Sequence, residues 1–526
     1  MPMKIVKYLN VISAPLLSAA FFYAGWAPSK SIFINFAFVP LFYYWSGLRT
    51  FRQIIFSAAI FSFFTSLFSA HWIIQGVINY AQTSWVVGAV FLIFFALINN
   101  YHIILAAGLW KLLNIRPSNS IASFSVLILL YSTLEILPTI FPGQVGVAWL
   151  VNEIPSFFLA KYIGIEGISA IILFCNFFLL KIFTTPIQAQ KRQYSVSLLL
   201  LLLVAYLGGS FIGGNDRKLA VLPNSTNGES IEILLVQPNI SNPDKINEQQ
   251  SITKRKIMKT LIELTKAGMA AAAEQNRKID LIIWPETAVP EVFNQQHLGG
   301  IYQKEVLDLV KESKSPLITG AYFEEKDGLF SNAVFLLLPS GEISKYRKNS
   351  LLPGGESNTF LAKLPWIGEK FKFAASLVAS NDPSQIALGQ TLNLEISICY
   401  EGILKRYNSE NFIIPAIAIN VANDLWFGDY FEPTQHAFIT LAKSIEANRS
   451  MARVANSGIS FVYDSIQNTT SVMRSNMAST ALVSLKTPHA NAESFYVKNK
   501  WILITLKLLF IVGIFLFFKF RPKYSS

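Results

Sequence analysis

The chain has 526 residues, of which 14% are charged and 52% are hydrophobic, and its formal net charge is +12. About a quarter of the residues of an ordinary soluble protein are charged, so this composition favours an integral membrane protein. An aromatic content of 13% and a mean hydropathy of +0.41 exclude intrinsic disorder. Two cysteines, Cys175 and Cys399, cannot supply a disulfide framework, and the five histidines show no zinc-binding spacing. We therefore expect no metal and no cofactor.

The apolar residues are concentrated in the first two-fifths of the chain. About twenty apolar residues are needed to cross the hydrocarbon core of a membrane. Candidate spans lie at residues 9–26, 31–48, 54–76, 85–110, 120–140, 163–183 and 195–213, and an eighth at 501–518. The first could instead be a cleaved signal peptide, because Lys4 and Lys7 precede it.

Lysine and arginine predict the orientation of these spans. Twelve of them flank one side of the alternating spans, whereas the short loops of the other side hold only Lys30 and Lys161. Because positive residues stay on the cytoplasmic side, both termini are predicted to be cytoplasmic. The seven spans that precede the large middle segment then place that segment outside.

The middle segment has the pattern of a soluble α/β domain. Strands are expected at residues 231–236, 281–284, 317–321, 333–338, 394–399, 416–421 and 460–463, and helices at 252–274 and 435–450. Short strands with helices between them predict packed α/β sheets rather than an all-β barrel.

The predicted organisation has four parts. They are a seven-span membrane domain (1–213), a linker rich in Gly, Asn and Ser (214–228), an extracytoplasmic domain (229–493), and a C-terminal membrane helix with a cytoplasmic tail (500–526). No nucleotide-binding glycine loop is present, and the positive charge lies partly in predicted cytoplasmic loops. Nucleic acid is therefore not a predicted partner.

Three residues of the extracytoplasmic domain follow or end predicted strands. Glu286 follows an apolar run that ends at a proline, Lys348 lies in a basic run before a glycine-containing turn, and Cys399 ends an alternating strand. Each residue alone is more often structural: a surface glutamate, a solvated lysine and a small buried hydrophobe.

Together, however, these residues indicate a catalytic site. A thiol becomes nucleophilic as the thiolate, which needs a base or a nearby positive charge. Glu286 could be that base and Lys348 that charge. Lys348 would also stabilise the oxyanion of a tetrahedral intermediate beside the backbone N–H of Tyr400. The set predicts acyl transfer through a thioester on Cys399.

The motifs around these residues resemble a known superfamily. Trp-Pro-Glu at 284–286, Tyr-Arg-Lys-Asn-Ser-Leu-Leu-Pro-Gly-Gly-Glu at 346–356 and Cys-Tyr-Glu-Gly at 399–402 are similar to motifs of the nitrilase (carbon–nitrogen hydrolase) superfamily. With spans before the domain and one after it, the chain resembles the apolipoprotein N-acyltransferases, which are the membrane-embedded members. The resemblance implies a polytopic α-helical membrane domain plus a nitrilase-like αββα sandwich.

The resemblance also implies roles for individual residues. Glu286 would be the general base, Lys348 the oxyanion stabiliser and Cys399 the nucleophile. Glu356 would hold the lysine, and Glu401 would be the carboxylate just beyond the nucleophile. Residues expected to line the site are Tyr400, Asn332 and Trp426.

The implied reaction is part of bacterial lipoprotein maturation. Cys399 would take a fatty acyl chain from a phospholipid, typically phosphatidylethanolamine, and pass it to the N-terminal amino group of an S-diacylglyceryl-cysteine apolipoprotein. The implied location is the cytoplasmic (inner) membrane, with the catalytic domain on the periplasmic side. One alternative is a membrane-tethered carbon–nitrogen hydrolase or amidase, in which water would resolve the acyl-enzyme. Another is a non-catalytic lipid or lipoprotein binding protein with the same fold.

Two further segments carry smaller expectations. The insert between Glu356 and the Cys399 strand is dense in apolar residues from Phe360 to Leu377, which predicts a lid that dips into the membrane surface; ordinary core packing is the alternative. His436 precedes a predicted helix and is expected to cap it or to line the site, with no role as a base.

Overall fold

The computed structural model describes residues 10–27, 31–47, 49–115, 119–213, 230–246, 250–293, 300–357, 377–428, 431–487 and 490–520. Internal contacts divide the chain into two units. The helical unit comprises Met1–His71, Val90–Asn215 and Ser494–Ser526, and the sheet unit comprises Trp72–Ala89 and Asp216–Glu493. The segment Trp72–Ala89 therefore belongs to the sheet unit, although the residues on both sides of it belong to the helical unit.

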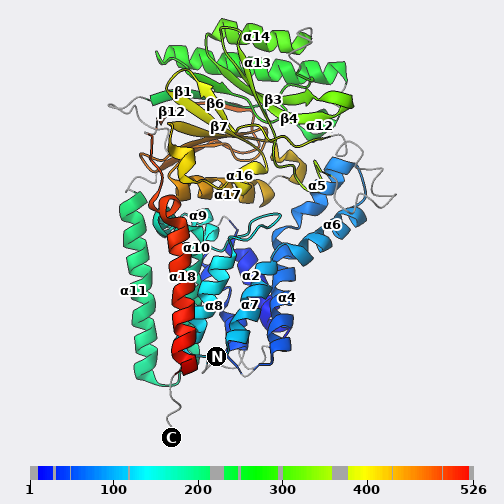
Figure 1. Ribbon diagram of the computed structural model, residues 1–526. Coiled ribbons are helices and arrows are strands. Elements are labelled where there is room, and N and C mark those ends of the chain that lie inside the picture. The colour runs from blue at the N-terminus through cyan, green and yellow to red at the C-terminus, as the bar shows by residue number, and fades with distance from the viewer. Residues whose placement is uncertain are drawn as a thin grey trace. The chain divides into compact units, whose positions relative to one another are not determined.

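The helical unit consists of apolar helices (Figure 1). Their bounds are α2 Ser13–Gly25, α3 Val39–Ser46, α4 Phe51–Ser69, α6 Trp85–Ile98, α7 Tyr101–Leu113, α8 Ile121–Leu134, α9 Val147–Val151, α10 Ala160–Thr184, α11 Gln188–Gly213 and α18 Phe495–Phe520. The first turn of α6, up to Ala89, still belongs to the sheet unit. Within the described ranges, five helical stretches are long and apolar enough to cross a membrane: Phe51–Ser69, Trp85–Leu113, Pro155–Thr184, Gln188–Gly213 and Phe495–Phe520. The number of spans and the predicted domain boundaries stay predictions.

A buried carboxylate joins the last helix to α10. Glu166 lies two residues after Gly164, whose φ of +75° breaks the regular helix. Tyr496 donates its hydroxyl to Glu166 at 2.5 Å, and Lys507 Nζ lies 3.9 Å from the same carboxylate. Lys507 therefore lies within reach of an opposite charge, which reduces the cost of a lysine in an apolar helix.

In the part of the sheet unit that the structure describes, twelve strands form two six-stranded sheets. The first has the order β12-β1-β2-β3-β4-β5 and the second β11-β10-β9-β8-β7-β6. The strands of the first sheet are β1 Ser230–Gln237, β2 Leu281–Ile283, β3 Leu317–Glu324, β4 Phe330–Leu337, β5 Ile343–Arg347 and β12 Ser479–Lys486. Those of the second are β6 Gln385–Leu388, β7 Leu392–Ile398, β8 Ala416–Ala422, β9 Met451–Ala455, β10 Phe461–Asp464 and β11 Thr469–Val472.

Both sheets have the same internal pattern. Strands β1, β2 and β3 are parallel at the centre of one sheet, and β7, β8 and β9 are parallel at the centre of the other. Antiparallel strands flank each parallel set. Ligands of such sheets bind beyond the carboxyl ends of the parallel strands, which is where β2 and β7 deliver Glu286 and Cys399.

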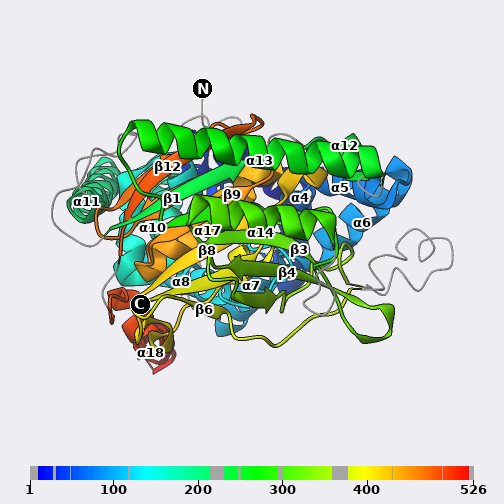
Figure 2. The same ribbon diagram turned by 90° about the horizontal axis from the view of Figure 1, so that it is seen from above.

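Helices cover the outer faces of the two sheets. Helices α13 (Ser251–Glu274) and α14 (Ile301–Ser313) lie over the first sheet, as Figure 2 shows, and their apolar faces share a buried core with it. Helices α16 (Glu401–Leu404) and α17 (Phe431–Ala447) cover the second sheet (Figure 1). A second core of Ile, Leu and Val side chains fills the space between the sheets. The predicted αββα sandwich is confirmed.

The strand predictions hold for the apolar strands and fail for the polar ones. All seven predicted strands are present, but β5, β6, β9, β11 and β12 were not predicted. Strand β5 carries Lys345 and Arg347, and β9 carries Arg453, so neither has the apolar run or strict alternation of the others. The helix predicted at 435–450 ends at Ala447, because β9 begins at Met451.

Candidate active site

Glu286 reaches the site through a close approach of backbone to backbone. The turn after β2 lies against β3 at Gly320, where a Cβ atom would lie 2.4 Å from the backbone N of Thr287 and 2.8 Å from Glu286 Cα. Only glycine allows the turn to come this close. The tryptophan of the Trp-Pro-Glu motif is fixed to helix α13, because Trp284 donates its indole N–H to Thr265 at 2.9 Å.

Lys348 lies between two buried carboxylates. Its Nζ is 2.6 Å from Glu356 Oε2 and 3.6 Å from Glu286 Oε1. Asn332 on β4 joins the same two carboxylates, because its Nδ2 donates to Glu286 at 2.7 Å and to Glu356 at 3.0 Å. The Lys348 side chain is 1% exposed, so the cation is withdrawn from water and neutralised by protein groups.

Cys399 occupies a strained turn at the end of β7. Its φ is +50°, in the left-handed region that residues other than glycine seldom adopt. The Cys399 N–H donates to the carbonyl of Val421 at 2.7 Å, which holds the turn against β8. The thiol interacts electrostatically with the Glu286 carboxylate. The predicted glutamate, lysine and cysteine are therefore brought together in one buried group.

Burial shifts the proton affinities of this group. It raises the pKa of the Glu286 carboxyl, and the ammonium of Lys348 offsets only part of that effect. Burial and the Glu286 carboxylate raise the pKa of the Cys399 thiol well above its ordinary value. Burial lowers the pKa of Lys348, but Glu356 and Glu286 more than offset this, so that its pKa is raised.

These directions determine what the group can do. Lys348 keeps its charge, and the resting proton lies on the thiol. A carboxylate with a raised pKa is a better acceptor for that proton than an ordinary glutamate. The arrangement can therefore transfer the thiol proton to Glu286 while Lys348 faces the developing negative charge.

The supporting residues divide into two kinds. Glu401 holds backbone rather than reacting groups: its Oε1 accepts from the N–H groups of Asn349 and Ser350 at 2.7 and 3.0 Å, and its Oε2 from Ile398 N–H at 2.8 Å. It thus joins the Lys348 loop to the end of β7. Tyr400 is buried beside the site, and burial raises its pKa to about 12 against the Lys348 charge.

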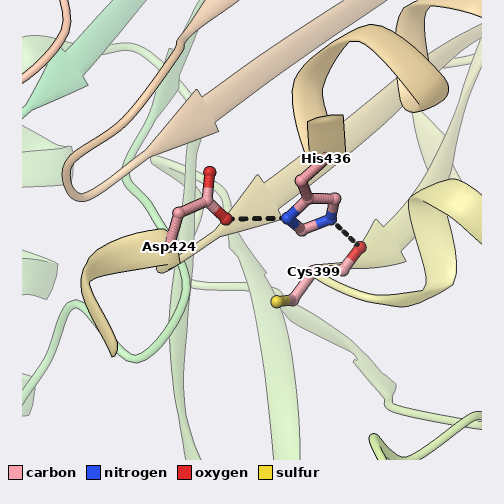
Figure 3. Close-up of side chains that lie close together, drawn as sticks. All are labelled: Cys399, Asp424 and His436. Carbon is pink, nitrogen blue, oxygen red and sulfur yellow. Dashed lines mark hydrogen bonds and ion pairs between the residues drawn. The ribbon is translucent and has the colours of Figure 1, made fainter. Parts of the chain in front are cut away.

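A buried charged network behind Cys399 was not predicted as a unit. His436 lies 2.8 Å from Asp424, as Figure 3 shows. Arg453 donates to the other oxygen of Asp424 at 2.7 Å. Arg453, in the middle of the fully buried strand β9, was the available signal, because a buried guanidinium needs a carboxylate partner.

This network also brings three possible metal ligands together. Donor atoms of Cys399, Asp424 and His436 lie within 4.8 Å of one another. Both ring nitrogens of His436 are engaged, with Asp424 at 2.8 Å and with the Cys399 carbonyl at 3.1 Å. A metal ion would have to displace one of these partners, so the geometry favours hydrogen bonding.

Helix α5 (Trp72–Ala81) is an unexpected part of the site wall. The sequence placed residues 54–76 in one membrane span, but α4 ends at Ser69 and α5 packs within the sheet unit. Asn79 donates to the carbonyl of Trp426 at 2.9 Å. The ring of Tyr80 lies 5.8 Å from that of Trp426, centroid to centroid.

The pKa of Tyr80, on α5, is shifted by the charged residues of the site. Burial raises its pKa; Glu356 and Glu286 add to this effect, and Lys348 opposes it. At the other end of the helix, Trp72 donates its indole N–H to Gln435 at 2.9 Å. Hydropathy alone could not reveal these contacts, because an apolar helix packed on a protein has the same composition as one packed in lipid.

The packing of α5 within the sheet unit can be tested at Gly76, which lies in close contact with Phe427. A Cβ atom at Gly76 would lie 2.6 Å from the ring of Phe427. We expect Gly76→Leu to lower the free energy of unfolding of the sheet unit by about 1–3 kcal/mol, because it overpacks the contact. Thermal unfolding in detergent measures the effect. Gly513→Leu is the matched control, since nothing lies within 4 Å of a Cβ at that helical position. Equal unfolding temperatures for the two variants would contradict the contact.

Two family models match the chain. One is described as carbon-nitrogen hydrolase and matches residues 235–485. The other is described as apolipoprotein N-acyltransferase N-terminal domain and matches residues 14–178. Together they cover most of both units.

Individual proteins are similar to the chain over different lengths. An apolipoprotein N-acyltransferase of Bdellovibrio bacteriovorus is 28% identical over 463 residues, which cover 85% of this chain and 82% of the relative. One of Chlorobaculum tepidum is 27% identical over 350 residues, which cover 61% of each chain. Among solved structures, an amidase from Nesterenkonia sp. aligns with 50% of this chain and 93% of its own, at 13% identity and a TM-score of 0.36.

Proposed function

We propose that this chain, which belongs to the carbon–nitrogen hydrolase superfamily, transfers a fatty acyl group from a phospholipid to the N-terminal amino group of an S-diacylglyceryl-cysteine apolipoprotein. It is a multi-pass membrane protein. The observation that carries the proposal is the buried Glu286–Lys348–Cys399 group in a chain that also contains the N-terminal domain of apolipoprotein N-acyltransferases.

In the first half-reaction Cys399 becomes acylated. Glu286 takes the thiol proton, and the sulphur attacks the ester carbonyl of the phospholipid. A C–S bond forms and the C–O bond of the ester breaks. Glu286 returns the proton to the leaving oxygen, which gives a lysophospholipid. Lys348 stabilises the negative oxygen of the tetrahedral intermediate; loss of one such donor typically costs about 2.7–4 kcal/mol.

In the second half-reaction the acyl group leaves the enzyme. The amino nitrogen of the apolipoprotein attacks the thioester carbonyl, a C–N bond forms, and the C–S bond breaks. Glu286 accepts a proton from the nitrogen and returns it to the sulphur, so the enzyme regains its starting state. Glu356 and Asn332 hold Lys348 and Glu286 in place throughout.

The lipid substrates account for the membrane part of the chain. Burial of an acyl chain is worth about 0.8 kcal/mol per methylene, so a soluble enzyme would have to extract its substrates at a large cost. We assign the protein to the bacterial inner membrane, with the catalytic domain on the periplasmic side and both termini in the cytoplasm. Phosphatidylethanolamine is the proposed donor.

The proposed layout follows the sequence prediction with one change. Residues 1–213 form the membrane domain except for Trp72–Ala89, which belong to the sheet unit; residues 214–228 form the linker, 229–493 the catalytic domain, and 500–526 the last membrane helix and tail. Tyr400 and Trp426 line the site, and Glu401 holds the turn of the nucleophile. Most of the predicted apolar lid lies outside the described residues.

Intact mass measures the first half-reaction directly. Detergent-purified protein incubated with phosphatidylethanolamine should gain the mass of one acyl chain, which hydroxylamine should remove. Cys399→Ala should gain nothing, and Cys175→Ala, which changes the other cysteine, should behave like the unsubstituted protein.

The outcomes separate the proposed activity from its alternatives. Rapid loss of the adduct in water without an acceptor would favour a hydrolase. No adduct from folded protein with several phospholipids would reject the acyltransferase in favour of a binding protein.

A further inference from the structure

The two ring nitrogens of His436 both face hydrogen-bond acceptors. Nδ1 lies 2.8 Å from Asp424 Oδ1, and Nε2 lies 3.1 Å from the backbone oxygen of Cys399. Figure 3 shows the carbonyl of Cys399, rather than its sulphur, turned toward the ring. A neutral imidazole carries only one N–H. Both hydrogen bonds therefore exist together only when His436 is doubly protonated.

The surroundings of His436 favour the charged ring. Asp424 faces it from the turn before α17, Glu432 from one turn earlier on α17 at 3.4 Å, and Arg453 from β9 through Asp424. Burial raises the pKa of the Asp424 carboxyl, but Arg453 and His436 more than offset this, so it stays ionised. Burial and Arg453 lower the pKa of His436, yet Asp424 and Glu432 raise it overall, to about 9.

The Nε2 hydrogen bond of His436 is made to the backbone of Cys399, the strained residue of the site. Cys399 has a φ of +50°, and such a conformation persists only where its surroundings hold it firmly. The Cys399 carbonyl accepts from His436 Nε2 at 3.1 Å, from Gly402 N–H at 2.9 Å and from Asn420 Nδ2 at 3.4 Å. Of these donors, only the imidazolium is charged, and charged donors make the stronger bonds.

We propose that His436, held as an imidazolium by Asp424, is a positioning residue that fixes the backbone of Cys399 and so aims its thiol at Glu286 and Lys348. The inference rests on the proposed function only in taking the Cys399 thiol as the reacting group. His436 never touches the substrate. It acts through the main chain, and its loss misaligns the nucleophile without removing any reacting atom.

Charge on His436 makes the proposal testable through pH. Below pH 9 the ring is doubly protonated and both hydrogen bonds are intact. As the pH rises through about 9, the ring loses a proton and one of the two bonds is lost. The rate of acylation should therefore fall on the alkaline side, with a limb near pH 9. The thiol titrates at a higher pH, because its pKa is raised well above the ordinary value.

The experiment compares His436→Gln with the unsubstituted protein, both in a Cys175→Ala background, between pH 6 and 10. Glutamine keeps one amide donor but carries no charge. The variant should acylate more slowly at pH 7, by on the order of 10- to 100-fold as for other small misalignments, and its alkaline limb should disappear. A limb unchanged in position, or an unchanged rate, overturns the proposal.

Two further variants separate positioning from folding. Glu432→Gln removes one carboxylate beside Nδ1 but leaves the Asp424 bond, so it should move the alkaline limb to lower pH. A limb that stays in place in this variant counts against the imidazolium. His71→Gln, at an exposed histidine of the helical unit, is the matched control and should leave both rate and limb unchanged.

Alkylation by iodoacetamide keeps the test independent of the lipid substrate. The reagent needs only the Cys399 thiol, so it reports on positioning even where phospholipid gives no acyl-enzyme. At pH 7.5 His436→Gln should alkylate more slowly than its parent, by about 10-fold or more if Glu286 no longer meets the thiol. Equal alkylation rates in folded protein would refute the positioning role.

Discussion

Exchange of Glu286 for Gln should lower the rate of acyl-Cys399 formation by about 10²–10⁴-fold, the usual contribution of a general base. Glutamine has nearly the same shape, and its oxygen can still accept the hydrogen bond from Asn332 Nδ2. It cannot take the thiol proton, however, and the thiol pKa is too high for spontaneous ionisation at neutral pH. The fold should survive while the chemistry fails.

The pH profile should change with the rate. Burial raises the pKa of Glu286 despite the charge of Lys348, and only the ionised carboxylate can act as a base. In the unsubstituted protein the rate should thus fall as the pH drops through this raised pKa, at a higher pH than for an ordinary glutamate. Glu286→Gln should lack this acid limb.

Single-turnover acylation with phosphatidylethanolamine, followed by intact mass, measures both effects. Glu263→Gln is a suitable control, because the Glu263 side chain is 66% exposed and lies on the outer helix α13. An acid limb that persists in Glu286→Gln would assign the base to another group.

The proposed catalytic group of Glu286, Lys348 and Cys399 could be predicted because its signals are local. Glu286 follows an apolar run and Cys399 follows an alternating strand, and a proline or a turn marks where each of them ends. Each residue lies at the carboxyl end of a parallel strand, β2 in the first sheet and β7 in the second. Lys348 follows the polar strand β5, and only the motif around it indicated its place.

The network behind the nucleophile depends on contacts that no local pattern contains. Asp424 precedes α17, His436 lies within it, and Arg453 comes from β9. Their meeting depends on how α17 packs against the second sheet. The sequence indicated His436 as a cap or a lining residue, whereas its ring contacts the Asp424 carboxylate and the main chain of Cys399.

Helix α5 shows a different limit. A hydropathy average over about twenty residues does not detect the break between Ser69 and Trp72, because the residues on both sides of it are apolar. The polar residues that mark the site face are Gln75, Asn79 and Tyr80, and each is compatible with the end of a membrane span. Only tertiary contacts, such as that of Asn79 with Trp426, assign the helix to the sheet unit.

Replacement of Lys348 by Met should both inactivate and destabilise the protein. Removal of the oxyanion stabiliser should slow acylation by about 10²–10³-fold. The same change leaves Glu286 and Glu356 buried without their shared cation. Removal of one partner from a buried ion pair typically costs about 3–5 kcal/mol. The remaining carboxylates should then share a proton, since two like charges this close cannot both ionise at neutral pH.

A double variant separates the two effects of the lysine. Adding Glu356→Gln to Lys348→Met removes the second negative charge while keeping one oxygen, which can accept either from Asn332 or from Leu352 N–H. Thermal unfolding should therefore recover much of the lost stability, but acylation should stay low, because nothing replaces the charge beside the intermediate. If stability and acylation returned together, the loss in the single variant would have come from misfolding and Lys348 would have no direct part in the reaction. If neither stability nor acylation returned, the uncompensated carboxylates would not be the cause of the instability.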